Sequence, residues 1–152
     1  MNFRKEFFSR LKSIDNYKKV CELETIYFQH GETTVLRHSR NVAYISYIFA
    51  KRLEKKYNIS FNYDNLIKGA FLHDFFIYDW HEKSKTHRLH GFTHPVTAGV
   101  NAKEICNVSD NVVNIIQTHM WPLTLRKVPN NREALIVCIV DKYIATRETF
   151  KI

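Results

Sequence analysis

Six histidine and aspartate side chains, all of types that bind metal ions, are distributed along the chain among apolar residues. In chain order they are His38, His73, Asp74, His94, His119 and Asp141. Residues three, four and seven positions apart share one face of a helix, and at these spacings five of the six have apolar partners. His94 stands at a predicted helix start, where this test does not apply. The pattern therefore predicts a polar cluster that faces the interior.

The two aspartates turn this cluster into a predicted metal site. A single inward histidine is more often a hydrogen-bonded core residue, but an ionised carboxylate is costly to bury without a partner. No lysine or arginine shares the apolar helix faces of Asp74 and Asp141, and a divalent cation would satisfy both carboxylates and the histidines. Imidazole and carboxylate ligands together favour Fe, Mn, Co, Ni or Zn over Mg or Ca, with one or two ions per chain.

Helical periodicity and a scarcity of helix-breaking residues predict an all-α, single-domain bundle of six to seven helices over residues 1–152. Only four Gly and three Pro occur, and 45% of the residues are hydrophobic. The expected helices cover 3–13, 17–29, 33–57, 63–74, 93 or 94 to 106, 110–119 and 131–149, with irregular stretches at 75–92 and 120–130. Thr93 or His94 is the expected N-terminal cap of the helix that ends at 106, with Pro95 in its first turn. Ser109 is the expected cap of the helix over 110–119.

The chain is basic, with a formal net charge of +8 and a sequence pI near 9.4. The basic residues form no polybasic tail, which disfavours nucleic-acid and membrane partners and leaves a small phosphorylated substrate. Three cysteines without CxxC spacing indicate a reducing compartment. No apolar run has membrane-spanning length and the start does not match a secretory signal, so we expect a cytoplasmic protein of unspecified oligomeric state.

The order His…His-Asp…Asp resembles the HD-domain superfamily of metal-dependent phosphohydrolases. The segments that carry the resemblance are LRHSRNVA, GAFLHDFF and IVDKYIATRE, while FTHPVTAGVNA and VNIIQTHMWP are similar to the extra histidines of members with two metals. The resemblance covers roughly residues 33–149, which leaves 1–30 as an N-terminal helical extension. The stretch HDFFIYDWHEKSKTHRLHGFTHP also resembles a bacterial subgroup of small stand-alone HD-domain hydrolases.

This resemblance implies a ligand set and a reaction. The residues that would bind the first metal are His38, His73, Asp74 and Asp141. Asp74 would bridge to a second metal held by His94 and His119. A metal-activated water, oriented by Asp74, would cleave a phosphate ester or anhydride of a small nucleotide or another phosphorylated metabolite.

Further side chains are candidates for the chemistry around the metals. His87 and His90, in the irregular stretch 75–92, are candidates for contacting phosphate or protonating the leaving group. The candidate phosphate-binding residues are Arg37, Arg40, Arg88, Lys127 and Lys142. Each of these is more often a solvated surface charge, and the aromatic residues of 75–92 more often pack on the bundle as a structured lid.

Other functions stay open on the sequence alone. Some HD-type proteins with two irons are oxygenases, and a degenerate HD fold could bind a nucleotide or a partner protein without catalysis. Nucleic-acid binding would need a basic stripe on one face, which the sequence does not contain. A separate zinc site at His81, His87, His90 and His94 is conceivable, but it lacks cysteines and a paired spacing.

Overall fold

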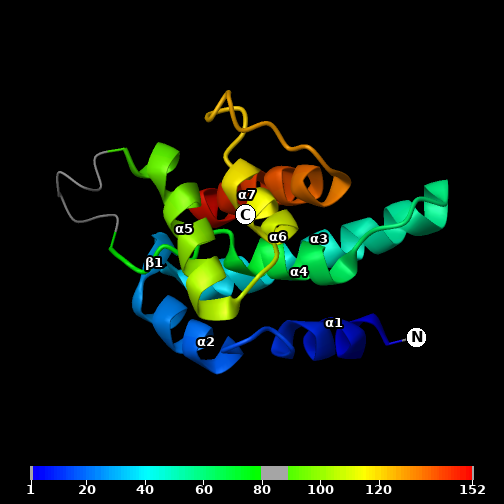
Figure 1. Ribbon diagram of the computed structural model, residues 1–152, viewed down its shortest axis with the longest axis horizontal. Helices are drawn as coiled ribbons and strands as arrows, with labels where there is room; N and C mark the ends of the chain where they lie inside the picture. Colours follow the sequence, from blue (N-terminus) through cyan, green and yellow to red (C-terminus); the bar gives the residue numbers. More distant parts are fainter. Residues whose placement is uncertain (1, 80–88, 152) are drawn as a thin grey trace.

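The computed structural model describes residues 2–79 and 89–151, and within these ranges the regular secondary structure is helical apart from one small hairpin. The helices are α1 (Phe3–Lys12), α2 (Tyr17–Ile26), α3 (Val35–Tyr57), α4 (Tyr63–Leu72), α5 (His90–Cys106), α6 (Asp110–Thr118) and α7 (Arg132–Phe150). Strands β1 (Phe28–His30) and β2 (Thr33–Thr34) pair antiparallel. The predicted all-α bundle of six to seven helices is confirmed (Figure 1). None of these helices combines the length and the apolar character that a membrane span needs.

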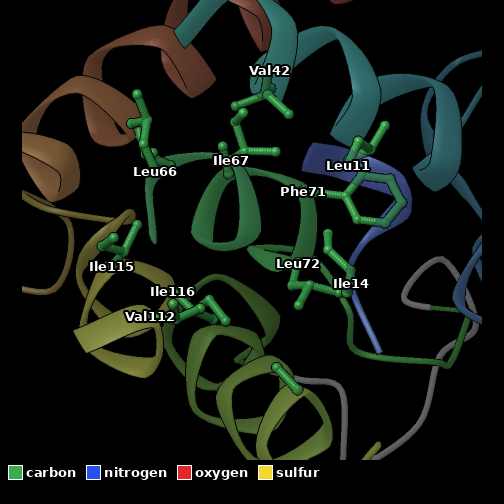
Figure 2. Packing of buried hydrophobic residues seen from close by; sticks show 14 of the residues in the cluster. Leu11, Ile14, Val42, Leu66, Ile67, Phe71, Leu72, Val112, Ile115 and Ile116 are labelled. Atoms are coloured by element: carbon green, nitrogen blue, oxygen red, sulfur yellow. The ribbon is translucent and has the colours of Figure 1, made fainter. Parts of the chain in front are cut away.

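Helix α4 forms the centre of the bundle because it is largely apolar and packs against α1, α3, α6 and α7 (Figure 1). Its fully buried side chains are Leu66, Ile67, Ala70, Phe71 and Leu72. Figure 2 shows the side chains of α4 that it labels between Val42 of α3 on one side and Ile116 of α6 on the other. Burying one leucine or isoleucine side chain contributes about 1.5–3 kcal/mol, so this packing fixes α4 and the two residues that follow it.

Helix α6 approaches α4 closely at Gly69. A Cβ at this position would lie 2.5 Å from Cγ2 and 2.8 Å from Cβ of Ile115, which is closer than van der Waals contact allows. Glycine therefore permits the short spacing between the two helices. His73 and His119 stand directly after the ends of α4 and α6, and their ring centroids lie 4.8 Å apart. The close approach at Gly69 thus helps to bring these two histidines together.

A hairpin replaces parts of two predicted helices. The helix predicted for 17–29 ends at residue 26, and the helix predicted for 33–57 begins at residue 35. Between them Phe28 pairs with Thr34, and Gly31 adopts a φ of 57° that favours glycine. The prediction was wrong here because strands of three and two residues are too short to show an alternating pattern.

Helix α5 begins at His90, before the cap predicted at Thr93 or His94, so Pro95 lies inside the helix rather than in its first turn. Two side chains support this unexpected start. The Thr93 hydroxyl donates to the Leu89 carbonyl over 3.1 Å, and His94 Nδ1 donates to the His90 carbonyl over 2.8 Å. These local bonds stabilise a turn that the usual position of proline does not predict.

Side-chain caps fix the starts of two helices that position candidate ligands. Thr34 Oγ1 accepts a hydrogen bond from the Arg37 backbone N–H over 3.2 Å at the start of α3. Ser109 Oγ accepts one from the Val112 N–H over 3.4 Å at the start of α6, as predicted. Each cap satisfies a backbone donor that the first helical turn leaves without a partner.

Candidate metal centre

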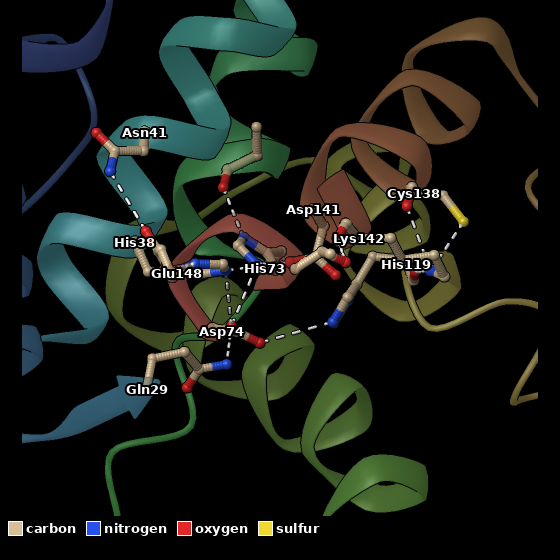
Figure 3. Close-up of polar contacts among 12 residues, drawn as sticks. Gln29, His38, Asn41, His73, Asp74, His119, Cys138, Asp141, Lys142 and Glu148 are labelled. Atoms are coloured by element: carbon tan, nitrogen blue, oxygen red, sulfur yellow. Dashed lines mark hydrogen bonds and ion pairs between the residues drawn. The ribbon is translucent and has the colours of Figure 1, made fainter. Parts of the chain in front are cut away.

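The structure brings all six predicted ligands together in the interior, and none is more than 7% exposed. They form two groups that share Asp74, and in each group one ligand atom per residue lies within 4.8 Å of the others. The first group consists of His38, His73, Asp74 and Asp141. The second group consists of Asp74, His94 and His119. Figure 3 shows how α3, α7 and the ends of α4 and α6 direct five of the six ligands, His38, Asp141, His73, Asp74 and His119, toward one centre, and α5 supplies His94.

His73 and His119 owe their orientation to the same local geometry. Each follows the last residue of a helix and turns its ring back onto a carbonyl three residues earlier. His73 Nδ1 donates to the Ala70 carbonyl over 2.7 Å, and His119 Nδ1 donates to the Ile116 carbonyl over 2.6 Å. A carbonyl oxygen only accepts, so Nδ1 carries the proton and a neutral ring has its lone pair on Nε2. In both residues Nε2 is therefore the atom available to a metal.

The other two histidines are oriented in an equivalent way by different partners. His94 Nδ1 donates to the His90 carbonyl over 2.8 Å, within helix α5. His38 Nδ1 lies 2.7 Å from Oε2 of Glu148, a carboxylate on α7. Glu148 also accepts from the Asn41 side-chain amide over 3.3 Å, one turn further along α3 (Figure 3). All four histidines thus present Nε2 to the centre, the arrangement found around bound metals.

Asp74 lies between the two groups and offers a different oxygen to each. Its Oδ2 lies 3.2 Å from His73 Nε2 and 3.6 Å from His38 Nε2, in the first group. Its Oδ1 lies 3.1 Å from His94 Nε2 and 3.6 Å from His119 Nε2, in the second group. A carboxylate with this orientation can ligate two cations at once.

The donor atoms fit a divalent cation better than they fit one another. Among the described residues, His73 Nε2 and Asp74 Oδ1 are buried without a well-aligned hydrogen bond, although their nearest partners in the two groups lie 3.1 to 3.3 Å away. His94 Nε2 and His119 Nε2 lie 3.0 Å apart, and with both Nδ1 protons already donated, two neutral rings would face each other with lone pairs. Asp141 Oδ1 completes the first group at 3.1 Å from His38 Nε2. Buried imidazole and carboxylate groups of this kind suit a transition metal.

Both aspartates are ionised at neutral pH. Burial alone would raise the pKa of the Asp74 carboxyl, but the charge and hydrogen bond of His73 and the hydrogen bond of His94 hold it well below its usual range. Burial acts in the same direction on Asp141, and the hydrogen bonds of His38 and His73 outweigh it, so its pKa is also well below the usual range. Ligand carboxylates must be deprotonated, so both side chains are ready to bind a cation.

His38 of the first group and His119 of the second group have opposite pKa shifts. Burial disfavours the charged form of His38, but its hydrogen bonds to Asp141 and Glu148 outweigh burial and raise its pKa to about 9. Burial and the positive charges of His73 and His94 lower the pKa of His119 to about 3. His119 is consequently neutral across the physiological range, whereas a cation in the first group has to displace the proton of His38.

The two groups border a pocket of about 580 Å³, large enough for a small organic ligand. Ligands from both groups line it, including Asp74, His94 and Asp141. Its apolar wall is formed by Met120, Pro122, Leu123 and Ala145, and its further polar lining includes Gln29, His90 and Lys142. The pocket therefore joins the candidate metal centre to a mostly apolar wall with few charges among the described residues.

Two of the additional residues predicted for the site line this pocket. The His90 ring stacks on His94, with centroids 4.4 Å apart, and its Nδ1 lies 3.0 Å from the Tyr78 hydroxyl. Lys142 Nζ donates to the carbonyls of His119 and Cys138 over 2.8 and 3.2 Å. The ammonium group is thus held beside the second group by backbone oxygens.

The structure does not bring the other predicted phosphate-binding residues to the described pocket lining. Arg40 donates to the Tyr17 hydroxyl over 2.9 Å and to Cys21 Sγ, on the far side of α3. Arg37 and Lys127 are exposed, and Lys127 Nζ donates to Gln117 Oε1 over 3.3 Å. The predicted residues His87 and Arg88 lie outside the described residues, as does His81 of the conceivable separate zinc site.

Sequence reasoning missed two residues that touch the ligands. Glu148 could have been found, because it lies seven positions after Asp141 and so shares its helix face. Gln29 Nε2 donates to Asp74 Oδ2 over 2.5 Å, and Gln29 is 7% exposed. No sequence signal marks Gln29, because it stands in the short strand β1 where a helix was predicted.

A known protein family matches the part of the chain that carries the candidate ligands. The HD domain model matches residues 35–146, a range that contains all six candidate ligands. The chain belongs to the HD domain family, whose members are generally metal-dependent hydrolases. No curated protein and no solved structure matches the chain. Gln29 and Glu148 both lie outside the matched range.

Proposed function

We propose that the protein is a metal-dependent phosphohydrolase that cleaves a phosphate ester or anhydride of a small nucleotide or another phosphorylated metabolite. The observation that carries the proposal is the orientation of Asp74, which offers one oxygen to each of two buried ligand groups at the edge of a pocket. Membership of the HD domain family supports hydrolysis as the reaction class.

In this proposal the first group holds one divalent cation and the second group holds another. The bound ions would supply positive charge to the phosphoryl oxygens and lower the pKa of a water molecule. Asp74 orients the water between the two groups, since its oxygens face both. The remaining ligands keep the ions fixed and the carboxylates charged.

His90 and Lys142 act on the substrate side of the centre. His90 would be the proton donor to the leaving oxygen, because its ring lines the pocket and stacks on His94, one of the residues that would hold the second cation. The Tyr78 hydroxyl at 3.0 Å orients the His90 ring. Lys142 adds a positive charge to the pocket wall and stabilises the phosphate group.

The test is a metal analysis of protein purified without chelator, together with a hydrolysis screen. The screen covers nucleotides and phosphate esters, with Mn, Co, Ni, Mg or Fe added to protein stripped of metal. We expect bound transition metal and phosphate release that depends on it. Hydrolysis with equal rates in stripped and reloaded protein would contradict the proposal.

Two other outcomes would favour the alternative functions. Two irons per chain with dioxygen consumption and no phosphate release would favour an HD-type oxygenase. Absence of bound metal and of turnover with every added ion would favour a non-catalytic module that binds a nucleotide or a partner.

A further inference from the structure

The N-terminal hairpin contributes one side chain to the candidate metal centre. Strand β1 packs against α3 and α7, the two helices that carry His38 and Asp141. From this strand Gln29 reaches inward, and its Nε2 donates to Asp74 Oδ2 over 2.5 Å (Figure 3). A carboxylate oxygen only accepts, so the side-chain nitrogen of Gln29 is the atom that faces Asp74.

This hydrogen bond controls the rotation of the Asp74 carboxylate. Oδ2 accepts the hydrogen bond of the Gln29 amide and faces His73, whereas Oδ1 faces His94 at 3.1 Å. A change in the plane of the Asp74 carboxylate would misalign the bond to Gln29, and a half-turn only exchanges two equivalent oxygens. The amide thus fixes the plane in which the carboxylate presents one oxygen to each ligand group.

The oxygen of the Gln29 amide is buried next to the site. Gln29 Oε1 has no hydrogen-bond partner among the described residues, and the Gln29 side chain lines the pocket. An acceptor in this position matches a proton-bearing ligand, such as a water or a hydroxyl group that enters the pocket. The nitrogen of the Gln29 amide therefore bonds to the shared carboxylate, and its oxygen remains available to a ligand that binds beside Asp74.

We propose that Gln29 is a positioning residue that fixes Asp74 so that each carboxylate oxygen serves a separate cation. The inference rests on the two-cation part of the proposed function and does not depend on hydrolysis. Asp74 is one of three ligands in the second group and one of four in the first. Loss of the Gln29 amide should therefore weaken the second cation more than the first.

The test is a titration of Co²⁺ into metal-free protein, in which binding is measured by calorimetry and by visible absorption. The Gln29→Met variant keeps the length of the side chain and removes its amide. We expect wild type to bind a cation at each group, and the variant to bind the second cation about 10- to 100-fold more weakly. With Mn²⁺, the magnetic coupling between the two ions in electron paramagnetic resonance should decrease in the variant.

Two further variants make the result specific. Gln117→Met makes the same chemical change at a side chain that pairs with Lys127 outside the pocket, and it should titrate as wild type does. Gln29→Asn keeps an amide but shortens the side chain by one methylene, so it should resemble Gln29→Met. Circular dichroism shows whether each variant is folded.

The outcomes separate this inference from the proposed function. If both Gln29 variants bind each cation with the same affinity as wild type does, the role of Gln29 is overturned and the proposed function is not affected. A single bound cation in wild type would overturn the two-cation part of the proposed function and the Gln29 inference with it. Failure of both Gln29 variants to fold would also overturn the inference, because Gln29 would then stabilise the fold rather than position Asp74.

Discussion

The two ligand groups differ in charge and in their relation to the pocket. The first group has two carboxylates, with a third, that of Glu148, hydrogen-bonded to His38. The second group has only the shared Asp74 and two imidazoles. His94 and His119 line the pocket, whereas His38 and His73 are not among the described residues that do.

This difference indicates that two bound cations would not be equivalent. A cation in the first group would be held by more negative charge, and of its four ligands only Asp74 and Asp141 line the pocket, so it would act mainly to hold the core of the site. A cation in the second group would be bound less tightly and would face the substrate. Four predictions can break or sharpen this comparison.

Asp74→Ala should have the largest effect, because both groups lose their common ligand. We expect hydrolysis to fall by about 10³-fold or more, with loss of the second cation and weakened binding of the first. Metal analysis and phosphate release measure the two effects, and circular dichroism checks the helices. Asp110→Ala, at an exposed aspartate on α6 that pairs with Lys103, is the matched control and should retain activity. Full activity in Asp74→Ala would remove this residue from the mechanism.

His119→Ala should separate the groups. The variant loses one of two imidazoles in the second group and none in the first, so it should keep one cation and lose about 10²-fold in hydrolysis. His38→Ala should instead weaken the first cation. Metal content per chain, measured at rising free metal concentration, distinguishes the two variants. Identical titration curves would show that the groups are not separate sites.

The stability of the metal-free protein should fall as pH rises. The folded-state pKa of His38 is raised from 6.5 to about 9. The contribution of protonated His38 to the free energy of unfolding is therefore fully present below pH 6.5 and is lost as pH rises through about 9. The shift corresponds to about 3 kcal/mol of unfolding free energy. The raised pKa of His73 acts in the same direction, and both ligand aspartates titrate well below this window.

Urea unfolding at a series of pH values measures this effect. The buried carboxyl of Glu24 also has a raised pKa, caused by burial, so the series is best repeated in Glu24→Gln. Saturating Co²⁺ should remove most of the pH dependence, because the cation replaces the proton of His38. Stability that increases between pH 6.5 and 9 in metal-free protein would contradict the prediction.

Glu148→Gln should have the smallest effect. The variant replaces the charged acceptor of the His38 Nδ1 proton by a neutral one, 2.7 Å away in the native protein. We expect the first cation to bind about 10-fold more weakly and the second cation to bind unchanged. Calorimetric titration measures both affinities, and a selective loss of the second cation would reverse the roles that we assign to the groups.

Helical periodicity predicted most of the fold and the inward orientation of five of the six candidate ligands, whereas the resemblance to the HD-domain superfamily supplied their assignment to two metals and the role of His94. The spacing of apolar residues around His38, His119 and Asp141 gave their inward orientation, which burial in the structure confirms. The same rule argues against Arg40, because a residue two positions after His38 points away from it on a helix. The prediction of Arg40 as a phosphate ligand considered its position in the sequence but not this angle.

The remaining features depend on contacts that local patterns do not encode. The hairpin is too short to show a strand pattern, so Gln29 could not be connected to Asp74, which lies 45 positions away. The start of α5 was misplaced because Pro95 usually marks a first turn, whereas bonds from Thr93 and His94 extend this helix backward. A long-range contact decided the first case, and local side-chain bonds to the backbone decided the second.

The most direct test of the account is a crystal structure of Mn²⁺-loaded protein, with anomalous scattering data collected near the Mn absorption edge. The account predicts two anomalous peaks, one among His38, His73, Asp74 and Asp141 and one among Asp74, His94 and His119, with a different Asp74 oxygen facing each. A single peak, or peaks elsewhere in the chain, would contradict the central claim that Asp74 joins two metal sites.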